Sequence, residues 1–193
     1  MEPLRLEPGS TALIVIDLQR GILERATEPH SAAAVLSQTV RLAEAARRSG
    51  TLVVLVRAVP SPDGGDRLAP PADLPLGRPG PLPQDYAELP PELGPRPGDI
   101  LITKRQWGAF YGTELDLQLR RRGVRTLILA GIATNYGIES TARDAYERGF
   151  AQIFAEDAMS GIGAGAHGFA VTTVFPRIGR VRATADILAA LSA

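Results

Sequence analysis

The 193-residue sequence contains no cysteine, and this absence removes several kinds of chemistry at once. Without a thiol, the chain cannot form disulfides, hold a metal or an iron–sulfur cluster through thiolates, or use a cysteine as nucleophile. An excess of charge is also missing, because 21 basic residues balance 21 acidic ones. Since no net field would attract nucleic acid or an anionic membrane surface, we expect neither as a partner.

Long apolar runs and histidines are scarce as well. No apolar run approaches the ~20 residues that span a bilayer. The segment MEPLRLEPGS lacks the regions of a secretory signal, so we expect a cytoplasmic protein. The two histidines, His30 and His167, lie far apart in the sequence, which argues against a multi-histidine metal site. Nothing signals an all-oxygen magnesium site, and we predict neither a metal nor another cofactor.

The sequence does contain short apolar runs that alternate with helical patterns, which predicts an α/β fold. Apolar spacing, caps and glycine stops predict helices at 31–49, 113–123, 135–148 and 166–175, and a last helix capped by Thr184. The apolar runs predict mostly parallel strands at 11–17, 51–57, 99–104, 124–130, 151–157 and 179–183. We expect one three-layer domain over residues 1–193, with ligands at the carboxyl ends of its strands.

Residues 58–98 interrupt this alternation, because they hold 12 of the chain's 16 prolines and show little apolar periodicity. A proline-rich stretch of this length is either a disordered insert or a functional loop, and we expect a lid or a dimer arm. The polar side chains that such a loop offers to a ligand are Arg67, Arg78, Gln84 and Tyr86.

Asp17, Lys104 and the turn at 133–137 each follow directly on a strand and should meet at one edge of the sheet. Asp17 is either a general acid or base, whose pKa burial would raise and an ammonium would lower, or a helix cap. Lys104 is the one lysine beside 20 arginines, which favours a specific task, such as holding a carboxylate, over a solvated base. Gly137 either permits a tight turn or leaves space beside a substrate.

Aromatic and hydroxyl side chains close in sequence to Lys104 and to the turn at 133–137 are candidates for the core, for the pocket wall or for a nucleophile. Phe110 is expected in the core, and Trp107 in the wall of a substrate pocket. Ser140 or Thr134 would be the nucleophile of a covalent mechanism, but neither has a histidine base nearby in the sequence pattern. The sequence has no Walker loop and no G-x-S-x-G elbow.

Four sequence blocks, in this order, resemble the isochorismatase-like hydrolases, also called the cysteine hydrolase superfamily. They are ALIVIDLQRG, ITKRQWGAFYGTELD, LILAGIATNYGIESTARDAYERGF, and the tail from AEDAM through His167 to TADIL. The resemblance implies a Rossmann-like fold with a six-stranded parallel sheet of order 3-2-1-4-5-6. It also implies a catalytic Asp17 and Lys104, a cis peptide bond between Ile132 and Ala133, and a homo-oligomer, either a dimer or a tetramer.

The sequence departs from the amidases of this family at Gly137, because TNYG stands where they carry the nucleophilic cysteine of TNxC. Their Asp-x-His-x-His metal motif is missing too. True isochorismatases carry glycine at this position, so the resemblance implies a hydrolase that needs no metal and forms no covalent intermediate. Asp17 would protonate a small carboxylated or enol-ether substrate similar to isochorismate, water would capture the cation, and Lys104 would organise charge.

The resemblance also implies a substrate pocket around this turn. We expect it to include Gln19, Arg67, Trp107, Ile132, Ala133, Thr134 and Tyr136. Isochorismatases carry tyrosine where this chain has Ala133, and Arg67 is the candidate counterpart of an arginine in their loop. Because the cysteine is absent, the alternative is a catalytically inactive member of the family that binds a small molecule or a protein.

Overall fold

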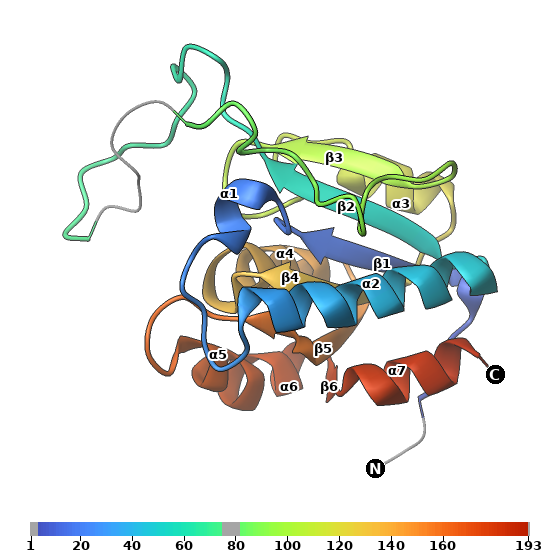
Figure 1. Ribbon diagram of the computed structural model, residues 1–193. Coiled ribbons are helices and arrows are strands. Elements are labelled where there is room, and N and C mark those ends of the chain that lie inside the picture. Colours follow the sequence, from blue (N-terminus) through green and yellow to red (C-terminus); the bar gives the residue numbers. More distant parts are fainter. Residues whose placement is uncertain (1–3, 75–81, 193) are drawn as a thin grey trace.

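A six-stranded parallel sheet forms the centre of the computed structural model, which describes residues 4–74 and 82–192 (Figure 1). The strands lie in the order β3-β2-β1-β4-β5-β6, which confirms the predicted order. They are β1 (Thr11–Ile16), β2 (Leu52–Ala58), β3 (Ile100–Lys104), β4 (Thr126–Ile132), β5 (Ala151–Ser160) and β6 (Arg180–Arg182).

Helices cover both faces of the sheet and complete the predicted three layers (Figure 1). One face carries α2 (Ala32–Ser49) and α7 (Thr184–Leu191), and the other carries α3 (Leu115–Arg121), α4 (Glu139–Glu147) and α6 (Phe175–Ile178). The shorter elements are η1 (Pro8–Ser10), α1 (Arg20–Leu23), η2 (Thr134–Ile138), α5 (Ala166–Phe169) and η3 (Ala170–Val174).

Helix α2 begins and ends where the sequence predicts. The Ser31 hydroxyl accepts a hydrogen bond from the Ala34 N–H at 3.2 Å and so satisfies a free donor of the first turn. The helix ends at Gly50, whose φ of 79° lies in the left-handed region that glycine adopts without steric cost. Its apolar face, which includes Val35 and Leu42, is buried against the sheet.

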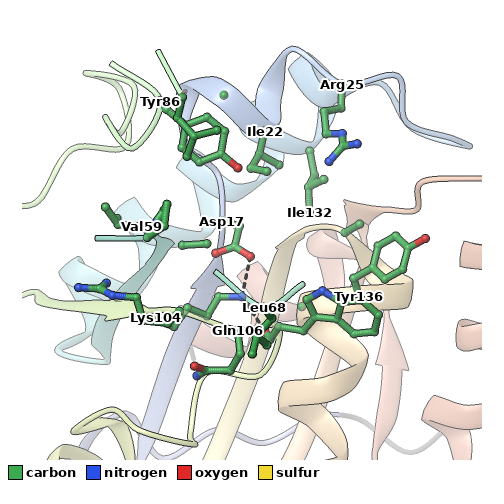
Figure 2. A pocket seen from close by; sticks show the side chains of 18 of the residues that line it. Asp17, Ile22, Arg25, Val59, Leu68, Tyr86, Lys104, Gln106, Ile132 and Tyr136 are labelled. Atoms are coloured by element: carbon green, nitrogen blue, oxygen red, sulfur yellow. Dashed lines mark hydrogen bonds and ion pairs between the residues drawn. The ribbon is translucent and has the colours of Figure 1, made fainter. Parts of the chain in front are cut away.

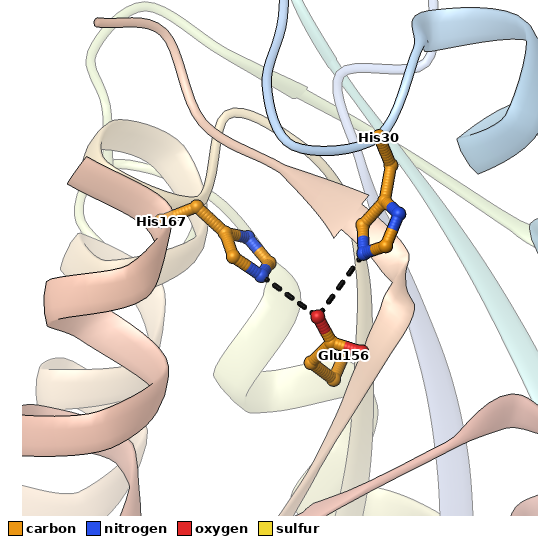
Figure 3. Close-up of side chains that lie close together, drawn as sticks. All are labelled: His30, Glu156 and His167. Carbon is orange, nitrogen blue, oxygen red and sulfur yellow. Dashed lines mark hydrogen bonds and ion pairs between the residues drawn. The ribbon is translucent and has the colours of Figure 1, made fainter. Parts of the chain in front are cut away.

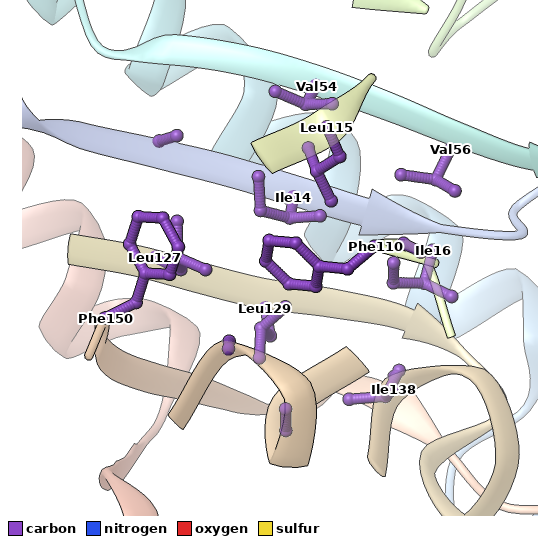
Figure 4. Packing of buried hydrophobic residues seen from close by; sticks show 14 of the residues in the cluster. Ile14, Ile16, Val54, Val56, Phe110, Leu115, Leu127, Leu129, Ile138 and Phe150 are labelled. Carbon is purple, nitrogen blue, oxygen red and sulfur yellow. The ribbon is translucent and has the colours of Figure 1, made fainter. Parts of the chain in front are cut away.

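Strand β1 is buried at every position, which explains why TALIVI is continuously apolar. Its alternate side chains enter two different cores. Ile14 and Ile16 share a cluster with Phe110 between the sheet and helices α3 and α4 (Figure 4), whereas Leu13 and Val15 share one with α2. Phe110 is therefore a core residue, as predicted, and packing on both sides fixes the end of β1.

The predicted carboxyl ends of β4 and β5 are wrong. β4 ends at Ile132 instead of at 130, and β5 ends at Ser160 instead of at 157. The extra pairs are Gly131 with Met159 and Ile132 with Ser160, and they follow a break in the register between the two strands. Such a pairing depends on a partner strand, so the apolar pattern of either segment alone does not contain it.

Helix starts also differ from the predictions. The helix expected at 135–148 begins as the π-helical turn η2 and becomes α-helical at Glu139, while α1 was not predicted at all. Thr184 does not cap the last helix. Instead, Asp157 Oδ1 accepts a hydrogen bond from the Thr184 N–H at 2.6 Å, so the cap comes from the neighbouring strand. Thr113 accepts from the Leu115 N–H at 3.1 Å and stands just before α3, close to its predicted place.

The described parts of the proline-rich loop, 59–74 and 82–99, contain no helix or strand. The second part is held against α1, because the N–H groups of Arg20 and Gly21 donate to the carbonyls of Glu88 and Tyr86. Residues 75–81, including Arg78, lie outside the described residues, and the assignment as lid or dimer arm stays a prediction. None of the described helices is long and apolar enough to cross a membrane.

Candidate active site

A cavity of about 670 Å³ opens at the carboxyl ends of the central strands (Figure 2). Asp17 follows β1, Lys104 is the last residue of β3, and the turn that holds Gly137 follows β4. The strand order places β1 beside β4, where the connections diverge to opposite sides, and open α/β sheets hold ligands at such a point. The three features predicted to converge therefore share one cavity.

Asp17 and Lys104 form a buried ion pair in this cavity. Asp17 Oδ2 lies 2.7 Å from Lys104 Nζ, and the residues are 7% and 2% exposed. Asp17 has a φ of 53°, and its N–H donates to the Val56 carbonyl at 2.9 Å. This left-handed conformation is uncommon for a residue with a side chain and clusters at functional positions. Asp17 is therefore not a helix cap, and Lys104 is not a solvated base.

Burial controls the protonation of Asp17. Desolvation raises the pKa of its carboxyl to about 6, although the charge and hydrogen bond of Lys104 lower it. Its second oxygen, Oδ1, is buried and has no hydrogen-bond partner among the described residues. Asp17 thus combines an oxygen that Lys104 fixes, an oxygen without a protein partner, and a pKa near neutrality, which are properties suited to a general acid.

Lys104 is a fixed cation. Besides its ion pair with Asp17, Nζ donates a hydrogen bond to the Trp107 carbonyl, so the loop after β3 folds back over the ammonium. A buried ammonium between two oxygen acceptors keeps its position better than a solvated one, because its rotamers are restricted. The one lysine of the sequence is therefore a buried residue that two oxygen acceptors hold in place.

Gly137 leaves room beside the ion pair. A Cβ atom at this position would lie 3.1 Å from Asp17 Oδ2, 3.2 Å from Lys104 Nζ and 2.9 Å from Ile16 Cγ2. Any side chain here would therefore point at the two charged groups. The absence of a side chain opens this volume to whatever enters the cavity.

Five of the seven residues predicted to bind substrate line the cavity; they are Arg67, Trp107, Ile132, Ala133 and Tyr136. The peptide bond between Ile132 and Ala133 is cis, as the resemblance implied. The rings of Trp107 and Tyr136 lie 5.0 Å apart and form an aromatic wall; Figure 2 shows Tyr136 below Ile132. From the loop, Tyr86 also lines the cavity, whereas Gln84 does not.

Gln19 and Thr134 are not on the cavity wall. The buried Gln19 amide bonds the Ala58 carbonyl at 3.0 Å, the Ala58 N–H at 2.8 Å and the Tyr86 carbonyl at 3.1 Å, so it joins the ends of β1 and β2 to the loop. The fully buried Thr134 hydroxyl lies 2.9 Å from His167 Nδ1. Both side chains thus hold elements that shape the cavity.

Sequence reasoning missed two basic residues of the cavity, Arg25 and Arg105. Arg105 pairs with Asp66 at 2.8 Å, whereas the Arg25 guanidinium has no ion-pair partner within the described residues. Figure 2 shows Arg25 above Ile132, at the upper edge of the cavity. Arg25 was missed because the short helix that precedes it was not predicted. Arg105 directly follows Lys104, so its place in the sequence could have indicated that it lies at the cavity.

The distance between the two histidines in the sequence does not keep them apart in the fold. His30 Nε2 and His167 Nε2 lie 3.0 and 3.1 Å from the same oxygen of Glu156 (Figure 3). The fold brings two distant segments together here, which sequence distance does not reveal. Thr134 consequently does have a histidine beside it, but its buried hydroxyl does not reach the cavity.

Comparison with known proteins gives matches over nearly the whole chain. Residues 11–186, which include every residue of the cavity wall, match the family described as isochorismatase domain. The uncharacterized isochorismatase family protein YecD of Escherichia coli O157:H7 is 49% identical over 188 residues, covering 97% of this chain and 100% of that protein. The ureidoacrylate amidohydrolase RutB of Methylorubrum extorquens is 37% identical over 182 residues, covering 81% of this chain and 72% of that protein.

Solved structures are similar over the same extent. An isochorismatase family protein from Burkholderia thailandensis has a TM-score of 0.93 and 42% identity, with 100% of both chains covered. The N-carbamoylsarcosine amidase from Thermoplasma acidophilum has a TM-score of 0.73 and 28% identity, covering 91% of this chain and 96% of that chain.

Proposed function

The chain belongs to the isochorismatase family of hydrolases, and we propose that it uses Asp17 as a general acid on a small carboxylated substrate with an enol-ether bond. The observation that carries this proposal is the buried ion pair of Asp17 and Lys104 beside Gly137. In the described cavity wall, no serine, threonine or cysteine side chain stands near this pair as a nucleophile. Acid catalysis by Asp17 requires none.

In the proposed reaction, Asp17 gives its proton to the terminal carbon of the enol ether, which leaves an oxocarbenium ion. Water adds to this cation and gives up a proton to the Asp17 carboxylate, and the resulting hemiketal breaks into an alcohol and a keto acid. Proton transfer converts Asp17 into a carboxylate 2.7 Å from the Lys104 ammonium, which stabilises the new negative charge. With a pKa of about 6, about one tenth of the carboxyl carries the proton at pH 7.

A carboxylated substrate is proposed because basic side chains outnumber acidic ones around the cavity. The basic residues are Lys104, Arg25, Arg67 and Arg105, against Asp17 and Glu24. Among them, Arg25 has no ion-pair partner within the described residues, so its guanidinium is free to pair with a substrate carboxylate. The aromatic wall of Trp107 and Tyr136 suits the apolar face of a small ring.

The proposal is tested with isochorismate and simpler enol ethers, by following release of the keto acid. Asp17→Asn should lower kcat by about 10²–10⁴-fold, since it cannot donate the proton. Arg25→Gln should mainly raise KM, because it removes a binding contact that is the same in the ground and transition states. The control is Arg41→Gln, an exposed arginine on α2 that bonds Gln38 and lies outside the cavity wall.

The results separate acid catalysis from its alternatives. Turnover by Asp17→Asn at the rate of the wild type would refute acid catalysis by Asp17. Stabilisation of the wild type by these compounds in thermal unfolding, without release of keto acid, would instead support a binding protein.

A further inference from the structure

His30, Glu156 and His167 form a second cluster of functional side chains, and none of them lines the cavity (Figure 3). Glu156 Oε1 lies 3.0 Å from His30 Nε2 and 3.1 Å from His167 Nε2, and the three ligand atoms lie within 4.8 Å of one another. They come from the loop before α2, from β5 and from α5.

Each of the three side chains is held in place by its surroundings. Glu156 lies where β5 bulges, because Leu129 pairs with Phe154 but Gly131 pairs with Met159, and bulges redirect side chains. The His167 ring is fixed by the Thr134 hydroxyl, 2.9 Å from Nδ1.

The His30 segment is fixed to the end of β5. The His30 N–H donates to the Ser160 hydroxyl at 3.2 Å. Glu28 and Gly161 exchange two backbone hydrogen bonds, at 2.9 and 3.1 Å. The cluster is therefore ordered before any ligand arrives.

We propose that His30, Glu156 and His167 bind a divalent transition-metal ion such as Zn²⁺. Two imidazoles and one carboxylate are a ligand set that zinc uses in proteins, with water in the remaining position. Bonds near 2.1 Å in tetrahedral geometry place neighbouring ligand atoms about 3.4 Å apart. The separations of 3.0 and 3.1 Å from Glu156 to the two histidines are close to this value, and all three ligand atoms lie within 4.8 Å of one another.

The surroundings of the cluster suit this chemistry. A neutral His167 that binds through Nε2 carries its proton on Nδ1, where it donates to the Thr134 hydroxyl, as ligating histidines donate to a neighbouring acceptor. Burial lowers the pKa of His167, which favours the neutral ring that a metal requires, although Glu156 acts in the opposite direction. The side chains of His30 and Glu156 are 29% and 34% exposed, so an ion can enter from solvent.

The composition makes the test unambiguous, because these are the two histidines of a chain without cysteine. The untagged full-length protein is freed of metal with a chelator and titrated with Zn²⁺ by calorimetry, with thermal unfolding as a second readout. We expect one Zn²⁺ per chain and a higher Tm in its presence. His30→Asn and Glu156→Gln should each weaken binding at least tenfold.

His30→Asn and Glu156→Gln leave the buried ring of His167 intact, so that loss of binding in them is not loss of folding. Circular dichroism checks the folding of every variant. Glu147→Gln, which removes an exposed carboxylate on α4, is the matched control and should bind as the wild type does. Thr134→Val should weaken binding about tenfold by removing the acceptor for His167 Nδ1. No saturable binding of Zn²⁺, or equal affinity in the wild type and His30→Asn, would overturn the proposal and leave a hydrogen-bonded cluster.

Discussion

Replacing Asp17 with asparagine should change how the stability of the protein depends on pH. The pKa of this carboxyl is raised from 3.8 to about 6 by burial. Between these two values the folded protein keeps a proton that the unfolded chain has lost, so the unfolded chain is the more ionised state. Stability therefore falls as the pH rises through this window. Because an asparagine side chain does not titrate, the Asp17→Asn variant should lack this part of the fall.

The magnitude follows from the size of the shift. A change of one pKa unit corresponds to 1.36 kcal/mol, so a shift of about two units costs the wild type about 3 kcal/mol at pH 7 relative to pH 3. The variant also leaves the buried Lys104 ammonium without its carboxylate, which is destabilising by itself. The informative quantity is therefore the slope of stability against pH, compared between the two proteins, and not their stability at a single pH.

The assay is urea unfolding at intervals from pH 4 to pH 8 for both proteins. Asp73→Asn, which removes an exposed carboxyl of the loop, is the matched control and should follow the wild type in parallel. Carbon-13 NMR of the side-chain carboxyls gives the midpoint of Asp17 directly in the wild type, assigned by its loss in the Asp17→Asn variant. Parallel stability curves for wild type and Asp17→Asn, together with a midpoint near 3.8, would refute the argument that burial outweighs Lys104 at this site.

Other predictions concern the same pair and the core. The proposed acid catalysis should speed up as the pH falls from 8 towards 6, with kcat/KM rising about tenfold per unit where Asp17 is mostly ionised; a flat profile would contradict it. Gly137→Ala should cost about 1–3 kcal/mol in urea unfolding and reduce turnover, since its Cβ would lie 3.1 Å from Asp17 and 3.2 Å from Lys104. Phe154→Ala should lose about 3–5 kcal/mol, because the ring is fully buried. Phe169→Ala, at an exposed position, should lose far less.

The meeting of Asp17, Lys104 and Gly137 could be predicted because it depends on topology. Each residue follows a strand whose apolar run marks it as central, and parallel strands bring their carboxyl ends to one edge. The sheet order came from the family resemblance, since strand periodicity alone does not order strands. The ion pair itself needed the structure, because 2.7 Å depends on rotamers and on the left-handed backbone at Asp17.

The roles of Gln19 and Thr134 and the meeting of the histidines could not be predicted for a different reason. Gln19 and Thr134 stand next to cavity residues in the sequence, but neighbouring side chains point in different directions, and these two point into the protein. His30 and His167 meet at Glu156, which lies in the part of β5 where the register with β4 shifts. A bulge arises from the pairing of two strands and leaves no signature in either one.

The proposed reaction depends on the residue at position 137, because this residue lies beside Asp17 and Lys104. Its φ lies outside the left-handed region, so the backbone would accept a side chain, which would point at Asp17 and Lys104. A thiol there would have an acid–base group and a cation within reach, the surroundings that a thiolate nucleophile needs. Glycine leaves the volume to the substrate, and Asp17 then has no thiol to deprotonate. With a pKa of about 6, part of the carboxyl stays protonated near neutral pH, as the proposed role of Asp17 as proton donor requires.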